Sequence, residues 1–222
     1  MKADPILGKK VHEHLVSLGI ETPLTAKILS PSEQKDKIEE HFAEIMKALH
    51  LDLTDDSLME TSRRVSKMFV NEIFYGLDYD NFPKCSVFEN KMSCPDEFIA
   101  VNDITFQSFC EHHFLPIINH DGGGCHIAYV PNKKIIGLSK LNRICKFFGA
   151  RPQVQERVGH QILEALKVIL ETDDVAVLIK ANHLCVEMRG VEDGTSITST
   201  CAMSGRFKDD PLFRGEFIKS CA

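Results

Sequence analysis

The chain has 222 residues, of which 43% are hydrophobic and 26% are charged, the composition of an ordinary globular protein. Its formal net charge of −6 argues against general nucleic-acid binding, although it leaves room for one basic pocket. No apolar run reaches the roughly 18 residues that indicate a membrane span, and the first residues lack the apolar stretch of a secretory signal. Eight cysteines without framework spacing favour reduced thiols or metal ligands over disulfides. We therefore expect a cytoplasmic protein.

The first third of the sequence has helical periodicity. Ser30, Pro31 and Glu33 form the pattern of a capping box, which predicts a helix that starts at residue 31. A second helix is predicted from Thr61 to Gly76, where the glycine would end it. In the first of these helices, apolar residues at helical spacing predict one buried face: Ile38, Phe42, Ile45, Met46 and Leu49.

From about residue 85 the hydrophobic pattern changes to that of strands. Strands are predicted over residues 98–109 and 125–130, separated by a glycine-rich loop over 119–124. The further predicted elements are helices over 138–148 and from Pro152 onward, strands over 175–189 and 196–203, and a helix over 213–219. This order predicts an α+β fold with a largely antiparallel sheet.

Residues 110–113 read Cys-Glu-His-His and follow a predicted strand. Cys110 and His113 have the short Cys-x-x-His spacing that one metal ion accepts. In a continued strand their side chains would point to opposite faces, so the chain has to turn here if both are to bind one ion. A lone cysteine is more commonly a small buried apolar residue, so this motif needs partners elsewhere in the chain.

A second group of reactive side chains lies within Asn-His-Leu-Cys-Val-Glu-Met-Arg, residues 182–189. In a strand, alternate residues share a face, and the four on one face are His183, Cys185, Glu187 and Arg189. A catalytic zinc ion has three protein ligands, often thiolate and imidazole groups. His183 and Cys185 are too close for the usual chelate, so we expect one of them to complete a site with the first motif.

A rival cluster flanks the glycine-rich loop and consists of His120, Cys125 and His126. We regard it as the weaker candidate and assign it no function.

Basic residues form pairs at i, i+3 on two predicted helices, so each pair shares a helix face. The pairs are Arg64 with Lys67 and Lys140 with Arg143, and Arg189 adds a further cation. Solvated helix faces are the common explanation of such pairs, whereas their convergence near a metal would suit a polyphosphate. The spacing alone leaves both interpretations open.

Gln155 and Glu156 lie near the predicted start of a helix, in the segment Arg-Pro-Gln-Val-Gln-Glu-Arg over 151–157. A carboxylate at this position is favoured by the helix dipole, which is a purely structural explanation. The alternative is that Glu156 is buried and accepts two N–H bonds from the edge of a guanine.

Together these segments resemble the GTP cyclohydrolase I family, the zinc enzymes that open pteridine and folate biosynthesis. The resemblance covers residues 51–217, with a weaker match over the helical N-terminus. Its strongest segments occur in matching order and spacing, at 110–113, 126–144, 151–157 and 182–190. The sequence departs from the family at 61–64, where Thr-Ser-Arg-Arg replaces the usual Thr-Pro-x-Arg, and in a longer loop over 119–124.

The resemblance implies a role for each matched residue. The implied ligands of Zn²⁺ are Cys110, His113 and Cys185. The implied proton donors and acceptors are His112 and His183. The implied contacts to substrate are Ser139, Gln155 and Glu156, with a triphosphate clamp of Lys140, Arg143, Arg189, Arg64 and Lys67.

The implied reaction is hydrolysis of GTP to formate and 7,8-dihydroneopterin triphosphate. Water activated by the metal attacks C8 of guanine while an imidazole protonates N7. The implied architecture is the tunnelling fold, an antiparallel sheet with two helices packed on one side, which closes into a barrel with other subunits. A homodecamer with sites at subunit interfaces is expected, with residues 1–80 as a helical N-terminal region and 81–222 as the catalytic domain.

Two other classes of function compete with this interpretation. A zinc-containing nucleotide-binding regulator without turnover would have no need of His112 and His183, which are present. A different tunnelling-fold enzyme, such as a pterin synthase or a deazaguanine reductase, would have three histidine ligands or a catalytic cysteine in another motif. Neither pattern is found in this sequence.

Overall fold

The computed structural model describes residues 2–91, 97–119 and 123–222. Its helical elements are α1 (Pro5–Ser17), α2 (Pro31–Ala48), α3 (Thr61–Met68), the π-helix η1 (Phe69–Ile73), the 3₁₀ turns η2 (Tyr75–Leu77) and η3 (Tyr79–Asn81), α4 (Leu138–Gly149), α5 (Gln155–Leu170), α6 (Leu184–Glu187), α7 (Arg206–Asp209) and α8 (Pro211–Ser220). Its strands are β1 (Val87–Glu89), β2 (Ile99–Ile104), β3 (Gln107–Cys110), β4 (Pro116–Ile118), β5 (Gly124–Tyr129), β6 (Lys134–Ile136), β7 (Pro152–Gln153), β8 (Val175–His183) and β9 (Thr198–Met203). No described helix combines the length and the apolar character needed to cross a membrane.

The main sheet is built around β8, which has strands on both sides. β5 and β9 pair antiparallel with the same stretch of β8, from opposite edges. β4 pairs with the end of β8 at Asn182 and His183, so β4 and β5 lie along the same edge of β8 as one interrupted strand. β3 pairs with β4, and β2 pairs with β5. Among the described strands of this sheet, the contact of β3 with β7 is the parallel one. The predicted α+β fold with a largely antiparallel sheet is confirmed.

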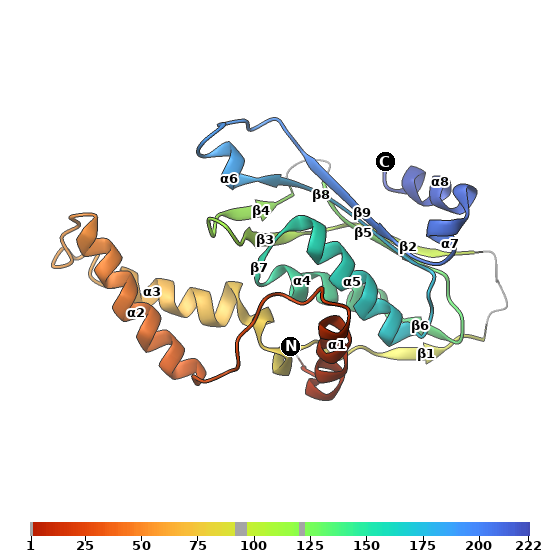
Figure 1. Cartoon of the computed structure of the whole chain (residues 1–222), viewed down its shortest axis with the longest axis horizontal. Coiled ribbons are helices and arrows are strands. Elements are labelled where there is room, and N and C mark those ends of the chain that lie inside the picture. The colour runs from red at the N-terminus through yellow and green to blue at the C-terminus, as the bar shows by residue number, and fades with distance from the viewer. Residues whose placement is uncertain (1, 92–96, 120–122) are drawn as a thin grey trace.

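The sheet has helices on both faces. α4 and α5 pack against one face (Figure 1), and α5 buries Val158, Ile162 and Leu166 there, as its periodicity predicted. α7 and α8 cover the other face with Phe207, Phe213 and Phe217. Each such side chain stabilises the fold by roughly 1.5–3 kcal/mol relative to exposure. The fold therefore has one apolar layer on each face of the sheet.

The N-terminal helix α1 belongs to the same core, because Val11 and Leu15 are fully buried in it. A buried ion pair holds the segment that follows. Nη1 of Arg151 donates to Oε1 of Glu21 at 3.0 Å, and Nη2 donates to the carbonyl oxygen of Gly76. A buried charge is costly unless it is paired and hydrogen-bonded, so Glu21 fixes this part of the chain beside β7. The domain boundary expected near residue 80 stays a prediction.

The helices α2 and α3 extend away from the rest of the molecule (Figure 1). The capping box of α2 is formed as predicted: the Ser30 hydroxyl accepts from the Glu33 N–H, and the Glu33 carboxylate accepts from the Ser30 N–H. The predicted apolar face is buried at Met46, whereas Ile45 and Leu49 are 53% and 65% exposed. This face is consequently free for further packing.

The helix predicted from Thr61 to Gly76 is wrong in its second half. The α-helix ends at Met68, the chain continues as the π-helix η1, and Gly76 lies inside η2. The N–H of Gly76 donates to the carbonyl oxygen of Ala150 at 2.9 Å, and a side chain at this position would collide with the backbone of Phe147 and Ala150. The glycine is therefore needed for a close backbone approach, not as a helix stop.

Two predicted boundaries near the site are also wrong. The strand over 98–109 is divided into β2, which pairs with β5, and β3, which pairs with β4. Within β2, Asp103 adopts φ +54° and the register shifts between Val101 and Ile104. The helix predicted from Pro152 begins only at Gln155. Pro152 and the residue after it instead pair with β3, so their backbone is not available for a helical turn.

Candidate metal and substrate site

The chain turns within Cys-Glu-His-His, as a shared ion requires. Cys110 ends β3, and its carbonyl oxygen accepts from the N–H groups of His113 at 3.3 Å and Phe114 at 2.8 Å. Phe114 adopts φ +54°, which reverses the chain so that the Cys110 N–H can donate to the Leu115 carbonyl oxygen at 2.8 Å. Sγ of Cys110 consequently lies 3.9 Å from Nδ1 of His113.

The strand predicted over 175–189 is wrong beyond His183. The pairing of β8 with β9 ends at Ala181 and its pairing with β4 ends at His183, so the next peptide groups have no strand partner. They bond locally in the single turn α6, where the Met188 N–H donates to the Leu184 carbonyl oxygen at 2.9 Å. The four residues expected on one strand face therefore do not share one.

The two motifs meet at one point. The ligand atoms of Cys110, His113 and Cys185 all lie within 4.8 Å of one another, and they form the one such group found among the described residues. Burial raises the pKa of the Cys185 thiol, and the neighbouring Cys110 thiol raises it further. Two thiols so close together disfavour a second negative charge, which a bound cation would compensate. The group thus has the composition and size of a metal site.

The other residues of the two motifs surround this group. Nδ1 of His112 lies 3.7 Å from Sγ of Cys110, and Nη1 of Arg189 lies 2.9 Å from Nε2 of His113. Glu111 forms an ion pair with Arg157 on the first turn of α5, and its N–H donates to the Gln153 carbonyl oxygen at 3.0 Å. The turn that carries the ligands is thereby attached to the start of α5.

His183 lies at the end of β8 and contacts the start of α5. Its Nε2 lies 2.8 Å from Oε1 of Gln155, which is buried. Burial lowers the pKa of His183, and the Glu156 carboxylate opposes this shift. A neutral imidazole is thus favoured near pH 7. Glu156, next along α5, is exposed and borders a small cavity of about 200 Å³ that Gly159 and His160 also line.

The remaining predicted cations are not gathered at this group within one chain. Lys140 and Arg143 lie near Cys85, where burial raises the thiol pKa to about 12 and the two cations lower it slightly. Gly149, at the far end of α4, packs on Gln107 of β3. An α-helix rises about 1.5 Å per residue, so Ser139 and Lys140 begin roughly 15 Å away from that end. Among the described residues, no hydrogen bond or ion pair joins Lys140 or Arg143 to the cluster.

Arg64 and Lys67 lie on α3 and are exposed. Neither side chain makes a hydrogen bond or ion pair with the described residues, whereas the neighbouring Arg63 donates to Glu60 at 3.0 Å. Two of the predicted clamp cations are thus free to meet an external anion.

The rival cluster does not form a site in the described residues. His120 lies outside them, as does Cys94. Cys125 and His126 are buried in β5 on opposite faces of the sheet. Burial lowers the pKa of His126. The nearby Asp103 raises this pKa by a smaller amount, and Lys180 lowers it further.

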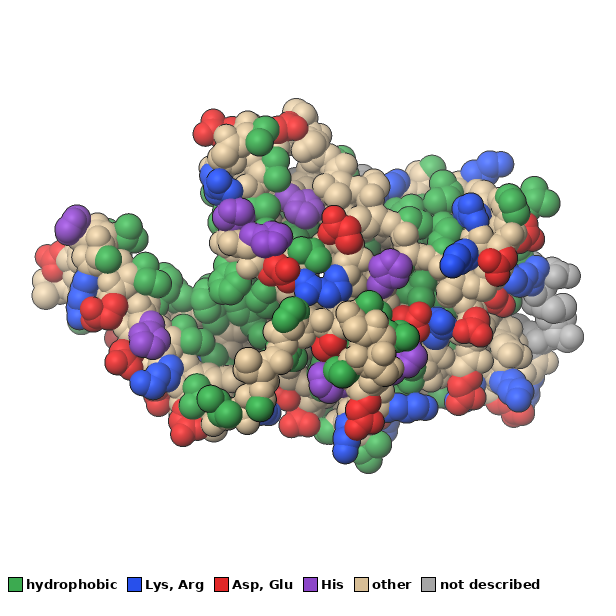
Figure 2. All heavy atoms as spheres, in the orientation of Figure 1, with side chains coloured by type: hydrophobic (Ala, Val, Ile, Leu, Met, Phe, Trp, Pro, Cys, Tyr) green, Lys and Arg blue, Asp and Glu red, His purple; other side chains and the backbone are tan. Residues whose placement is uncertain are grey.

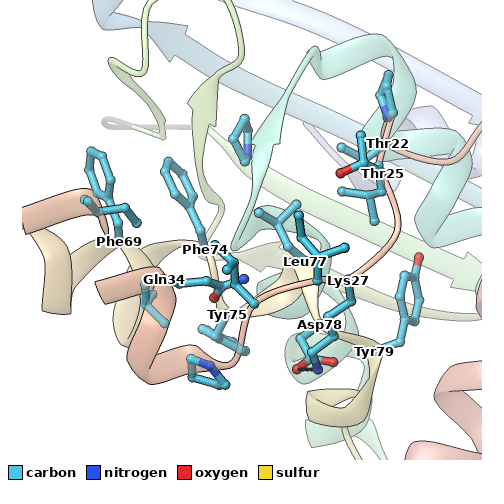
Figure 3. Close-up of a pocket in the computed structure, with 18 of the residues that line it drawn as sticks. Thr22, Thr25, Lys27, Gln34, Phe69, Phe74, Tyr75, Leu77, Asp78 and Tyr79 are labelled. Carbon is cyan, nitrogen blue, oxygen red and sulfur yellow. Dashed lines mark hydrogen bonds and ion pairs between the residues drawn. The ribbon is translucent and has the colours of Figure 1, made fainter. Parts of the chain in front are cut away.

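A hollow larger than the cavity beside Glu156 lies between the N-terminal helices and the rest of the chain. It is a groove of about 1490 Å³, and Figure 2 shows hydrophobic side chains gathered in it. Phe69, Phe74, Tyr75 and Leu77 line it, together with Thr25 and Lys27 of the segment between α1 and α2 (Figure 3). None of the predicted site residues lines this groove.

The residues that hold the site in place were not predicted from the sequence. Arg157 and Glu111 lie inside the recognised motifs, and their opposite charges were the available signal. Nothing in the local pattern indicated that Gln155 would contact His183. Such contacts join distant segments and depend on strand pairing.

Comparison with known proteins identifies relatives of this chain. A family model described as GTP cyclohydrolase I matches residues 38–222. The protein named GTP cyclohydrolase 1 from Photobacterium profundum is 56% identical over 208 residues, 94% of each chain. The protein of that name from Vibrio cholerae serotype O1 is 54% identical over 211 residues, 95% of each chain. The one from Shewanella sp. (strain MR-4) is 54% identical over 209 residues, 94% of each chain.

Proposed function

Because the chain belongs to the GTP cyclohydrolase I family, we propose that it hydrolyses GTP to formate and 7,8-dihydroneopterin triphosphate, the first step of folate and pteridine biosynthesis. The observation that best supports this activity is the cluster of Cys110, His113 and Cys185, whose ligand atoms lie within 4.8 Å of one another. Histidines and an arginine surround it, as a hydrolytic site for an anionic substrate needs.

We propose that Cys110, His113 and Cys185 bind Zn²⁺. Two thiolates and one imidazole are ligands that zinc prefers, and three protein ligands are typical of a catalytic ion that keeps one position open. When bound, zinc would supply the Lewis acidity that makes water nucleophilic near neutral pH. The thiols must lose their protons to bind zinc. The free energy of metal binding would offset the cost that the raised pKa of Cys185 adds to this deprotonation.

The chain's own residues would handle the protons and the guanine ring. His183 is favoured in its neutral form. It can therefore take up a proton and later donate it to N7 of the purine. His112, beside Cys110, is the second group for these transfers. Glu156, with Gln155 beside it, is placed at the guanine end, where a carboxylate can accept two N–H bonds.

The triphosphate would be bound by cations from more than one region of the chain. Arg189 lies at the metal group. Ser139, Lys140 and Arg143 begin α4, and Arg64 and Lys67 lie on α3. Since Lys140, Arg143, Arg64 and Lys67 make no hydrogen bond or ion pair with the cluster among the described residues, we propose that neighbouring subunits supply these groups to one site.

The assembly we propose is a homodecamer in which tunnelling-fold sheets close into barrels. Within the described residues, β2 and β9 each have one edge without a strand partner, and open edges of this kind are normally covered. Pairing between copies would cover both edges. The exposed apolar face of α2 with Ile45 and Leu49 offers a further contact surface.

We place the enzyme in the cytoplasm. All seven described cysteines are free thiols, which suits a reducing compartment.

The activity is tested by incubating the purified, zinc-loaded protein with GTP. Formate should be released in a 1:1 ratio with a pterin that becomes fluorescent after oxidation, in line with the proposed stoichiometry. Binding of GTP without either product would instead support a regulator that performs no turnover.

A further inference from the structure

The side-chain amide of Gln155 is fully engaged by protein groups. Gln155 is the first residue of α5 and is 1% exposed. Its Nε2 donates to the carbonyl oxygens of Ile179 at 3.0 Å and Thr198 at 2.9 Å, and lies 3.3 Å from Oγ1 of Thr200. Its Oε1 lies 2.8 Å from Nε2 of His183. The amide therefore bridges three strand residues and one histidine.

The chemistry of these partners determines which way the amide points. Two backbone carbonyl oxygens can only accept hydrogen bonds, so the NH₂ group of Gln155 has to face Ile179 and Thr198. Its oxygen consequently faces His183. Because an amide oxygen is an acceptor, Nε2 of His183 must carry a hydrogen to form this bond. The strand carbonyls thus define the tautomer of His183 through Gln155.

The other ring nitrogen of His183 remains available to a ligand of the site. Nδ1 makes no hydrogen bond with the described residues, whereas Nε2 is held by Gln155. With the hydrogen on Nε2 committed to Gln155, a neutral ring has its lone pair on Nδ1. This nitrogen is therefore the one that can contact a substrate in the site without breaking the bond to Gln155.

We propose that Gln155 is a positioning residue that orients His183 and makes Nδ1 its reactive nitrogen, and that it does not recognise guanine itself. This inference rests on the proposed cyclohydrolase activity and specifies the role of one residue in it. Glu156, the exposed neighbour of Gln155, is left as the group for the guanine edge.

The kinetic test compares Gln155→Met, His183→Ala and the double variant with the wild type, all zinc-loaded. A positioned acid–base group contributes typically 10²–10⁴-fold, so kcat of Gln155→Met should fall by about 10²-fold while KM for GTP changes by less than about threefold. In the His183→Ala background, Gln155→Met should change kcat by less than about threefold, because its route of action is already absent. Gln161→Met, which removes another buried amide of α5 that does not contact His183, is the matched control and should retain kcat.

Other results would overturn the inference. An increase of KM at constant kcat would mean that Gln155 contacts the substrate, and multiplying losses in the double variant would mean that it acts independently of His183. If the wild type forms no pterin from GTP, the proposed activity fails before the variants are compared. A test that needs no variant is neutron diffraction from crystals of the wild type in D₂O. Deuterium on Nε2 of His183 is expected, and its absence there would refute the proposal even if Gln155→Met does not fold.

Discussion

Nη1 of Arg189 lies 2.9 Å from Nε2 of His113, so a guanidinium contacts the imidazole whose other nitrogen faces the Cys110 thiol. This pair connects the two functions of the site, because one partner belongs to the proposed metal group and the other to the proposed triphosphate clamp. A permanent cation beside the reacting centre is the arrangement that an anionic substrate requires.

Arg189→Met should weaken the binding of GTP. Hydrogen bonds to charged groups contribute about 1.5–3 kcal/mol, so kcat/KM should fall roughly 10- to 100-fold, mainly through KM. Zinc content should not change, because Arg189 is not a proposed ligand. Arg63→Met is the matched control, since Arg63 is already paired with Glu60, and steady-state kinetics should match the wild type. An unchanged KM in Arg189→Met would remove this residue from the clamp.

Cys185→Ser and His113→Ala should lose bound zinc and turnover together while remaining folded. The core between the sheet and α4 and α5 includes Cys110, but most of it is built from aliphatic and aromatic side chains outside the site. Metal analysis, circular dichroism and the pterin assay measure the three properties. Cys221→Ser, which changes a thiol near Asn102, should retain both zinc and activity. Full activity of the wild type after chelation has removed its zinc would contradict the assignment of the metal.

Glu156→Gln should lower kcat/KM for GTP by about 10²-fold or more. An amide cannot accept two N–H bonds in the arrangement of a carboxylate, so a donor of the guanine edge is left unpaired. The loss should be much smaller for ITP, which lacks the 2-amino group, and the ratio of kcat/KM values for the two nucleotides is the decisive quantity. Equal losses for both would return Glu156 to a structural role at the start of α5.

Mixed oligomers should test whether one site contains residues from two chains. Cys185→Ala removes a proposed ligand, and Arg64→Ala removes an exposed cation of α3. If these groups serve the same site from different subunits, co-assembly of the two inactive proteins should regenerate some intact sites. Activity well above that of either parent is expected, with the mixed composition verified by mass spectrometry. No recovery in such oligomers would mean that each site is built within one chain.

The stability of the fold should decrease as the pH falls below about 6.5 because of His126. Burial lowers the pKa of this histidine in the folded state, so the unfolded chain binds more protons between the two pKa values. The free energy of unfolding then rises with pH, by at most about 1.4 kcal/mol per pH unit for one proton. The stabilisation from His126 is fully present above the pKa that this histidine has in the unfolded chain. His126→Gln should flatten the slope in urea titrations between about pH 7 and 5. An identical slope in that variant would show that His126 is not responsible.

Much of the secondary structure follows from the sequence. The capping box of Ser30 and Glu33 is formed, α4 and α8 lie within one or two residues of their predicted ranges, and β5 and β9 are close to theirs. These features depend on hydrophobic periodicity and on bonds between residues three or four apart, so the local sequence is sufficient to predict them. The motif of Cys110 and His113 was recognisable for the same reason.

The tertiary structure decided how the motifs meet. β8 ends at His183 because its pairing with β9 has already stopped at Ala181 and its pairing with β4 stops at His183. Only then can α6 bring Cys185 to Cys110. The bond between Gln155 and His183 likewise depends on the alignment of α5 with two strands. The sequence by itself determined the reactive groups and the family, since these depend on residue types and their order. The partners of each group were decided by strand pairing between distant segments, which no local pattern encodes.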